Sequence, residues 1–316
     1  MRCFYPLEAA HKGVGDKPVI YSKGKRPAVL SPGYEPLELR CGQCIGCRLT
    51  QSQDWMIRIM HEAKNQYSCF ITLTYDDEFL PYGKTLVPYH LELFWKRLRR
   101  RLEPIKIKYY AAGEYGSTCE DHAIEDCPLC GSLQRPHYHA VIIGFDFPDK
   151  KYLTERDGYP VYTSELLTSL WPSGIHEIGV LTHESAGYVA RYCTKVKTGK
   201  QKELHYRRYL PGIDLWVDLE PEFGRMSQGL GATWLSTMHD DVYKHDTVPV
   251  AGKGVVNKVP RYYDKIYEIA APREMVDIKI ERDRLFREFD ERPQPSLVSQ
   301  EKVAEAKNNQ LKRRLK

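Results

Sequence analysis

The segment HYHAVIIGF, at residues 137–145, is the part of the sequence that most directly indicates the fold. It is rich in strand-forming residues and carries two histidines, His137 and His139, separated by one residue. In a strand, residues i and i+2 face the same way, with their Cα atoms about 6.5 Å apart. The segment therefore predicts a buried strand that presents two imidazoles on one side of a sheet.

The surrounding chain supplies the other elements of an α+β fold. Three further segments have the composition of strands: 69–75, 107–112 and 174–181. Three segments have helical character: 88–102, 164–171 and 184–196. Their order, β-α-β-β-α-β followed by a helix, is close to the split βαβ plan of ferredoxin-like folds. We therefore expect a mostly antiparallel central sheet flanked by helices, with zinc-binding insertions.

Shifts in composition divide the chain into four expected segments. They are an N-terminal zinc-binding module with a helix at 1–64, a core at 65–204 with a cysteine-bearing insertion at 117–134, an accessory region at 205–272 and a charged helical tail at 273–316. Residues beyond 205 carry no recognisable motif, so their role is not predicted.

The overall composition is that of an ordinary globular protein, with 42% hydrophobic and 28% charged residues in a chain of 316. The net charge of +5 does not by itself mark a nucleic-acid binder, although basic residues cluster at 96–108. The first residues lack the apolar stretch of a signal peptide, and no apolar run is long enough to cross a bilayer. We expect a cytoplasmic protein without a membrane partner.

The cysteines form two clusters that are typical of metal sites. Nine cysteines yield three C-x-x-C pairs, against about 0.25 expected by chance. One cluster, a C-x2-H-x4-C-x2-C array, predicts a structural zinc site formed by Cys119, His122, Cys127 and Cys130. The other contains Cys41, Cys44 and Cys47, and Cys3 is the candidate fourth ligand. A redox or incidental role is the alternative for these cysteines.

The two histidines acquire a possible third partner from the preceding strand. Glu114 follows that strand in the sequence GEYG, so pairing of the two strands would bring its carboxylate to the imidazoles of His137 and His139. Two imidazoles and one carboxylate leave coordination positions open for a Lewis-acid metal. An H-x-H pair alone is weak support, because about 0.4 such pairs are expected by chance. Two structural histidines are the alternative.

A tyrosine pair offers nucleophiles for such a metal site. In a helix, Tyr188 and Tyr192 share a face, and Lys195 joins them three residues later. A phenol has an ordinary pKa of about 10, so it needs a metal at the phosphate and a nearby cation to act at neutral pH. Core packing is the usual reason for such a stripe, although leucine or isoleucine would suit a core better.

These motifs together resemble a known family. The order FITLTYDDE, RPHYHAVI, YVARYCTK resembles the three motifs of HUH endonucleases, and CGQCIGC with the cysteine-bearing insertion resembles the replication initiators of gokushovirus-like Microviridae. The resemblance covers roughly residues 41–200. It implies a five-stranded antiparallel sheet with the histidine pair on a central strand, in a protein that acts in the cytoplasm of a bacterial host.

The resemblance also implies a mechanism for rolling-circle replication. His137 and His139, with Glu114, would bind Mg2+ or Mn2+, and Tyr188 or Tyr192 would attack single-stranded DNA at the viral origin, supported by Lys195. The products would be a 5′-phosphotyrosine and a free 3′-OH that a host polymerase extends. Two tyrosines resemble the subfamily in which the pair alternates, so that strand transfer rejoins the displaced strand.

Two observations limit this interpretation. A Walker A motif is absent, because Glu78 stands where its first glycine is required before Gly83–Thr85, so unwinding is assigned to a host helicase. Four basic residues of the 88–102 helix are candidates for DNA contact or for a solvated helix face: Lys96, Arg97, Arg100 and Arg101. A zinc-stabilised DNA-binding protein without catalysis and a metal-dependent hydrolytic nuclease remain alternatives.

Overall fold

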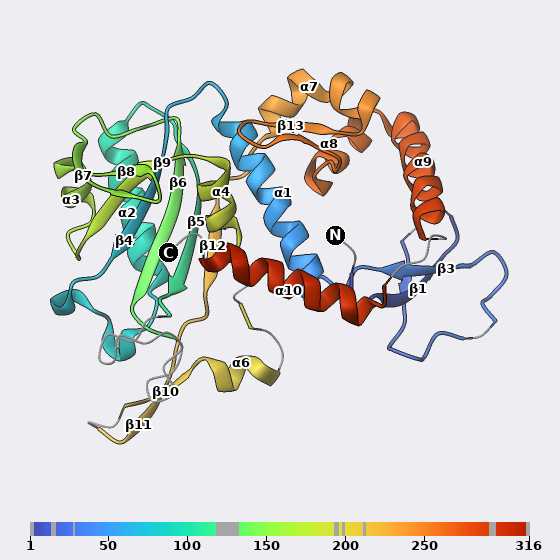
Figure 1. Cartoon of the computed structure of the whole chain (residues 1–316), viewed down its shortest axis with the longest axis horizontal. Coiled ribbons are helices and arrows are strands. Elements are labelled where there is room, and N and C mark those ends of the chain that lie inside the picture. Colours follow the sequence, from blue (N-terminus) through green and yellow to red (C-terminus); the bar gives the residue numbers. More distant parts are fainter. Residues whose placement is uncertain are drawn as a thin grey trace. The chain divides into compact units, whose positions relative to one another are not determined.

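A computed structural model describes residues 3–13, 17–27, 29–117, 133–192, 196–197, 200–210, 213–290 and 295–313. The chain forms two compact units (Figure 1). The first comprises Met1–Asp54, Leu235–Val248 and Val255–Lys316, and the second comprises Trp55–Trp234 and Pro249–Gly254. The four segments expected from composition stay a prediction, since these units group the chain by contact instead.

The second unit is built on a seven-stranded sheet with the order β12-β5-β6-β4-β9-β8-β7. Its strands are β4 (Ser68–Thr74), β5 (Lys108–Tyr115), β6 (Pro136–Ile143), β7 (Lys151–Arg156), β8 (Tyr159–Thr163), β9 (His176–Val180) and β12 (Phe223–Met226). Every pair is antiparallel, which confirms the predicted α+β class and its antiparallel sheet. The sheet has two strands more than the resemblance implies, although β6 lies inside it as expected.

Alternation along the strands separates the two faces of the sheet. In β4, every second residue is buried, starting with Cys69, while Phe70 and Thr72 lie on the other, half-buried face. In β6, Tyr138 belongs to the main hydrophobic core. The histidines at its two sides therefore face away from that core.

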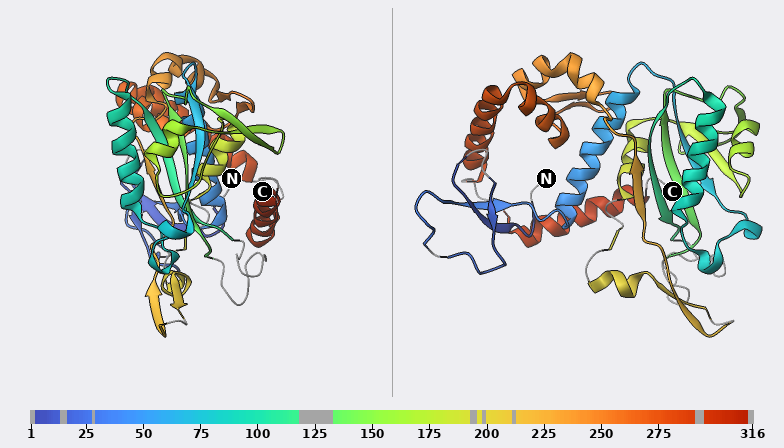
Figure 2. Two further views of the ribbon diagram at one scale, coloured as in Figure 1. Left: turned by 90° about the vertical axis from the view of Figure 1, so that its left-hand side faces the viewer. Right: turned by 180° about the vertical axis from the view of Figure 1, so that it is seen from behind.

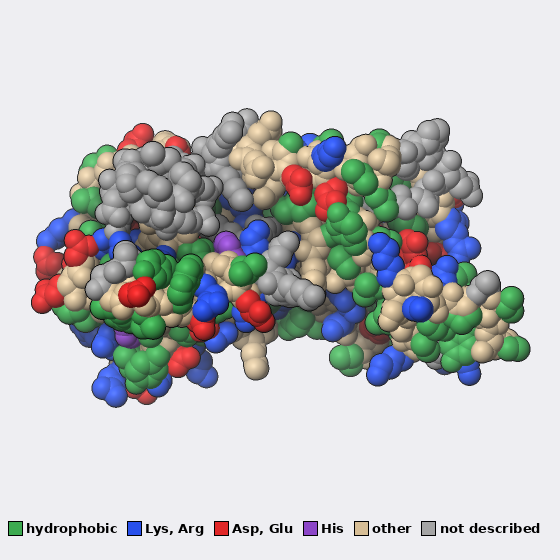
Figure 3. Space-filling view, turned by 90° about the horizontal axis from the view of Figure 1, so that it is seen from below, with side chains coloured by type: hydrophobic (Ala, Val, Ile, Leu, Met, Phe, Trp, Pro, Cys, Tyr) green, Lys and Arg blue, Asp and Glu red, His purple; other side chains and the backbone are tan. Residues whose placement is uncertain are grey.

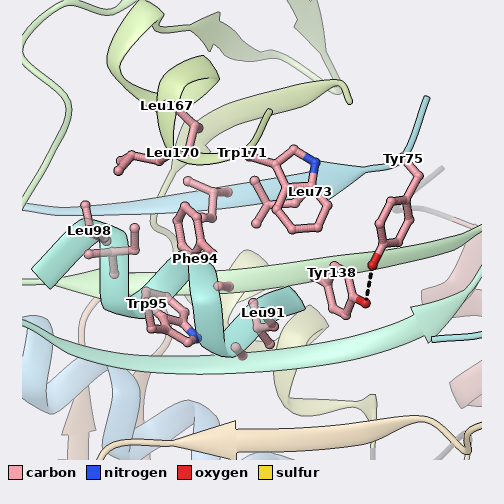
Figure 4. Close-up of a cluster of buried hydrophobic side chains, with 14 of the residues drawn as sticks. Leu73, Tyr75, Leu91, Phe94, Trp95, Leu98, Tyr138, Leu167, Leu170 and Trp171 are labelled. Atoms are coloured by element: carbon pink, nitrogen blue, oxygen red, sulfur yellow. Dashed lines mark hydrogen bonds between the residues drawn. The ribbon is translucent and has the colours of Figure 1, made fainter. Parts of the chain in front are cut away.

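Helices α2 (Pro88–Leu102) and α3 (Glu165–Leu170) cover the core face. The apolar stripe of α2 and the end of α3 pack onto the strands with Trp171 and Tyr138 (Figure 4). The phenol groups of Tyr75 and Tyr138 are hydrogen bonded at 2.7 Å, and the Tyr138 hydroxyl also lies 3.0 Å from Val87 N. These bonds satisfy two deeply buried hydroxyls within the core.

The opposite face of the sheet is covered by α4 (His183–Ala190) (Figures 1 and 2). A capping box between Thr182 and Ser185 fixes the start of α4. The later part of α1 (Ile45–Ala63) belongs to the same unit, where Trp55 packs against Tyr110 of β5. The remaining elements of this unit are the short helices η1 (Asp77–Phe79), η2 (Tyr82–Lys84) and α6 (Lys200–His205), and the hairpin of β10 (Arg207–Leu210) and β11 (Leu215–Asp218).

The first unit combines a small sheet with helices from the end of the chain. Its sheet has the order β2-β1-β3, formed by β1 (Leu7–His11), β2 (Val19–Ile20) and β3 (Glu35–Leu39). Its helices are the start of α1, most of α7 (Ala232–His245), α8 (Arg261–Ala270), α9 (Pro272–Asp290) and α10 (Leu297–Arg313). A two-stranded ribbon of β13 (Val248–Val250) and β14 (Gly254–Val256) follows α7. Among the described helices, none combines the length and the apolar character needed to cross a membrane.

Candidate active site

Strand register brings the three expected metal ligands together. Glu114 of β5 pairs directly with His137 of β6, and Ala112 pairs with His139, so all three ligands lie on the face turned toward α4. One ligand atom from each of Glu114, His137 and His139 lies within 4.8 Å of the others. Glu114 is 1% exposed and His139 is 7% exposed. A carboxylate and two imidazoles are thus held together at a mostly buried position.

The outer ring nitrogens of both histidines have hydrogen-bond partners. His137 Nδ1 lies 3.2 Å from the carbonyl oxygen of Arg135, and His139 Nδ1 lies 3.0 Å from Thr72 Oγ1. A proton on each Nδ1 leaves the lone pair of Nε2 available, which is the tautomer that a metal ligand needs. Arg135 is itself fixed by the carbonyl of Tyr75, at 2.8 Å, and by the carboxylate of Asp77.

This donor set fits a divalent cation with open positions. Imidazole nitrogen and carboxylate oxygen both bind first-row divalent metals, and three protein ligands leave room for substrate oxygens. Glu114, His137 and His139 are therefore the residues that could hold a metal at this face.

Tyr188 stands directly beside these ligands. Its hydroxyl lies 3.2 Å from His139 Nε2. Its ring meets His139 and Phe70 edge to face, at centroid distances of 4.9 and 6.4 Å. The capping box at the start of α4 and these ring contacts hold the phenol oxygen at the edge of the metal-ligand group.

Tyr192 does not share a helix face with Tyr188, contrary to the sequence prediction. Helix α4 ends at Ala190 with Arg191 as its C-cap, so the predicted helix 184–196 is too long. The Tyr192 ring instead reaches across to Gly224 of β12, where an added Cβ would stand 2.3 Å from Tyr192 Cζ, and it lies 6.1 Å from the Tyr110 ring. Lys195 lies outside the described residues, so its predicted supporting role stays a prediction.

Two residues near the site were not predicted from the sequence. Thr72 contacts His139, and the guanidinium of Arg191 lies 5.8 Å from the centroid of the Tyr188 ring. Burial lowers the pKa of Arg191, and the nearby Tyr188 and Glu114 oppose that shift. Arg191 is thus a cation within the motif YVARYCTK, three residues after Tyr188, and that spacing is the signal that could have identified it.

The expected zinc ligands have different outcomes. Cys119, His122, Cys127 and Cys130 lie outside the described residues. Cys3, Cys41, Cys44 and Cys47 come together in the first unit, with their sulfur atoms all within 4.8 Å of one another.

The basic residues considered for DNA contact lie away from the histidines. Lys96, Arg97, Arg100 and Arg101 line a shallow depression on α2, together with Leu93 and Leu170. Because α2 covers the core face, this depression is on the opposite side of the sheet from His139. Figure 3 shows lysine and arginine interspersed with acidic side chains over the described residues of one face, so charge alone does not identify a DNA surface there.

Comparison with known proteins agrees with the resemblance seen in the motifs. A family model for replication-associated protein ORF2 matches residues 68–124 and 127–197. The chain is 35% identical to replication-associated protein ORF2 of Spiroplasma virus 4, over 85% of this chain and 81% of that protein. It is 32% identical to replication-associated protein VP4 of Bdellovibrio phage phiMH2K, over 88% and 80%.

A more distant relative is replication-associated protein ORF4 of Chlamydia phage 1, which is 29% identical over 50% of this chain and 38% of its own length. No solved structure matches the chain. The extent of the first two matches confirms the predicted relationship, and the chain belongs to the replication-associated protein ORF2 family of small phages.

Proposed function

We propose that this protein starts rolling-circle replication by nicking single-stranded DNA at the phage origin and later rejoining the displaced strand. The observation that carries the proposal is the position of the Tyr188 hydroxyl, 3.2 Å from His139 Nε2, beside the group formed by Glu114, His137 and His139. A nucleophile and a set of metal ligands thus share one face of the sheet. The relatives, which are replication-associated proteins of phages, support the same role.

The chemistry follows from these side chains. The Tyr188 oxygen attacks the scissile phosphorus and forms a phosphotyrosine bond to the 5′ side, while the bond to the 3′ oxygen breaks and that oxygen leaves as a 3′-OH after taking a proton from water. A divalent ion held by Glu114, His137 and His139, Mg2+ or Mn2+, would supply Lewis-acid polarisation of the phosphate. Arg191 offers positive charge beside the phenol, which favours its ionised form.

The two tyrosines have different surroundings, and this suggests different roles. Tyr188 contacts a candidate metal ligand, whereas Tyr192 packs against Gly224. We assign the first cut to Tyr188 and the second, joining half-reaction to Tyr192. A host helicase would open the duplex and a host polymerase would extend the 3′-OH, in the cytoplasm of the bacterial host.

An adduct assay tests this proposal. The full chain is incubated with end-labelled single-stranded origin DNA and Mn2+, and denaturing gels detect protein-linked DNA. We expect loss of the first adduct in Tyr188→Phe, loss of joining in Tyr192→Phe and no adduct in the double variant. Tyr67→Phe is the matched control, because Tyr67 is exposed.

The other outcomes identify the competing functions. Cleavage that continues without an adduct in the double variant would indicate a hydrolytic nuclease. DNA binding without cleavage in the unmodified protein would indicate a zinc-stabilised DNA-binding protein. An adduct that persists at full yield in the double variant would exclude both tyrosines as nucleophiles.

A further inference from the structure

The four cysteines of the first unit come from three separate places in the chain. Cys3 precedes β1, Cys41 follows β3, Cys44 stands just before α1 and Cys47 lies in its first turn. The sulfur atoms of Cys41 and Cys47 are 4.0 Å apart, and those of Cys3 and Cys44 are 3.9 Å apart. The cluster therefore joins the N-terminal segment, the small sheet and the start of a helix.

These distances match one metal ion and exclude a disulfide. A disulfide needs sulfur atoms about 2.05 Å apart, and the five cysteines that the structure describes are all free. Zinc–sulfur bonds of about 2.3 Å place the sulfur atoms of a tetrahedral site about 3.8 Å apart. Because all four sulfur atoms lie within 4.8 Å of one another, the space between them suits a single ion better than a multi-iron cluster.

Backbone amides surround these sulfur atoms as donors. The N–H groups of Cys41 and Cys44 donate to the sulfur atoms of Cys3 and Cys41, both at 3.3 Å, and Phe4 N–H donates to Cys44 Sγ at 3.4 Å. Such donors stabilise thiolate charge, as does the N-terminus of α1 beside Cys44 and Cys47. The local backbone is thus arranged for four thiolates, the form in which cysteine binds a metal.

The cluster also forms much of a small apolar core. Cys3, Cys44 and Cys47 are buried together with Phe4 and with Ala304 of α10. Leu297, also of α10, packs against the same group. The hydroxyl of Tyr5 donates to Glu301 of α10 at 2.6 Å. A core this small gives little hydrophobic stabilisation, so a cross-linking ion would add much of the stability of this part of the unit.

We infer that Cys3, Cys41, Cys44 and Cys47 bind one structural zinc ion, and that this ion maintains the surface on which α10 packs. The ion joins the two ends of the chain within the first unit. This role is independent of the proposed DNA cleavage, since none of these residues belongs to the candidate active site.

Zinc content and cysteine protection test the inference. The full chain carrying Cys127→Ser is used, so that the other predicted zinc site does not contribute. Mass spectrometry should find about one zinc ion per chain. Adding Cys44→Ser should remove that ion, whereas adding Cys69→Ala, at a buried cysteine of β4, should leave it. Cobalt substitution should give the strong thiolate charge-transfer bands of a tetrathiolate site.

A second measurement does not depend on the folding of variants. In the same background, alkylation should spare the four cysteines until a zinc chelator is added, and chelation should increase hydrogen exchange in Leu297–Arg313. Zinc content unaffected by Cys44→Ser would overturn the site. Unchanged exchange in α10 after complete zinc removal would overturn the packing role. Since neither readout uses DNA, failure here is distinct from failure of the proposed nicking.

Discussion

The substitution Thr72→Val tests whether the second contact of His139 matters for metal binding. Thr72 pairs directly with His139 across β4 and β6, and its hydroxyl lies 3.0 Å from His139 Nδ1. Valine keeps the shape and the β-branched preference for a strand, but it cannot accept a hydrogen bond. The change therefore removes one interaction and leaves the sheet in place.

The expected magnitude follows from that contact. Removing the partner of a buried polar group costs about 1–3 kcal/mol. Loss of an outer contact to a ligating histidine typically weakens metal binding by about 10- to 100-fold, which corresponds to about 1.4–2.7 kcal/mol. The two ranges agree, so we expect Mn2+ affinity to fall by about 10- to 100-fold in Thr72→Val.

The chain offers a closely matched control. Thr163 Oγ1 lies 3.0 Å from His176 Nε2 at the β8–β9 side of the same sheet, away from the candidate site. Mn2+ titration followed by electron paramagnetic resonance should show weaker binding in Thr72→Val and ordinary binding in Thr163→Val. Saturating Mn2+ should restore adduct formation. Equal affinities in Thr72→Val and the unmodified protein, or equal losses in the two variants, would refute the reasoning.

Three further changes test other parts of the second unit. In Gly224→Ala the new Cβ would stand 2.3 Å from Tyr192 Cζ, so we expect joining to fall by about tenfold in a strand-transfer assay while the first cut continues; equal loss of both steps would contradict this. In Arg191→Gln, loss of the cation near Tyr188 should slow adduct formation at saturating Mn2+ by about tenfold, equivalent to about one pKa unit of the phenol; an unchanged rate would exclude this role. Burial lowers the pKa of His61 to about 4 from 6.5, so the unfolded chain takes up a proton that the folded chain does not. Stability should be full above about pH 6.5 and decrease toward pH 4 by up to about 3 kcal/mol, and urea denaturation should show a flatter decrease in His61→Phe.

The parts of the fold that the sequence predicted are those with strong local patterns. The alternation in β4 and the apolar stripe of α2 are both visible in the sequence, and both elements form near the expected limits. The neighbourhood of Glu114 and His137 could be anticipated because the two strands are close to consecutive and pair antiparallel. Local pattern and strand order were sufficient for the metal-ligand group.

The parts that were missed depend on contacts between distant segments. Strand β12 is four residues long and contains Gly224, so it has little strand signal of its own, and pairing with β5 places it in the sheet. In β7, every residue is exposed, so no alternation marks it. The early end of α4 is also unmarked, because Arg191 is neither glycine nor proline and Tyr192 is held by the same distant β12.

The strands of the second unit carry stability and chemistry on alternate residues. In β6, Tyr138 points into the core and is bonded to Tyr75, while His137 and His139 on either side face α4. A shift of one residue in the pairing would exchange the two faces and place both imidazoles in the apolar core. The buried hydroxyl bond between Tyr75 and Tyr138 opposes such a shift, because it would be lost with the register. The core face therefore fixes the position of the candidate metal ligands without touching them, and substitutions there should alter stability and site geometry together.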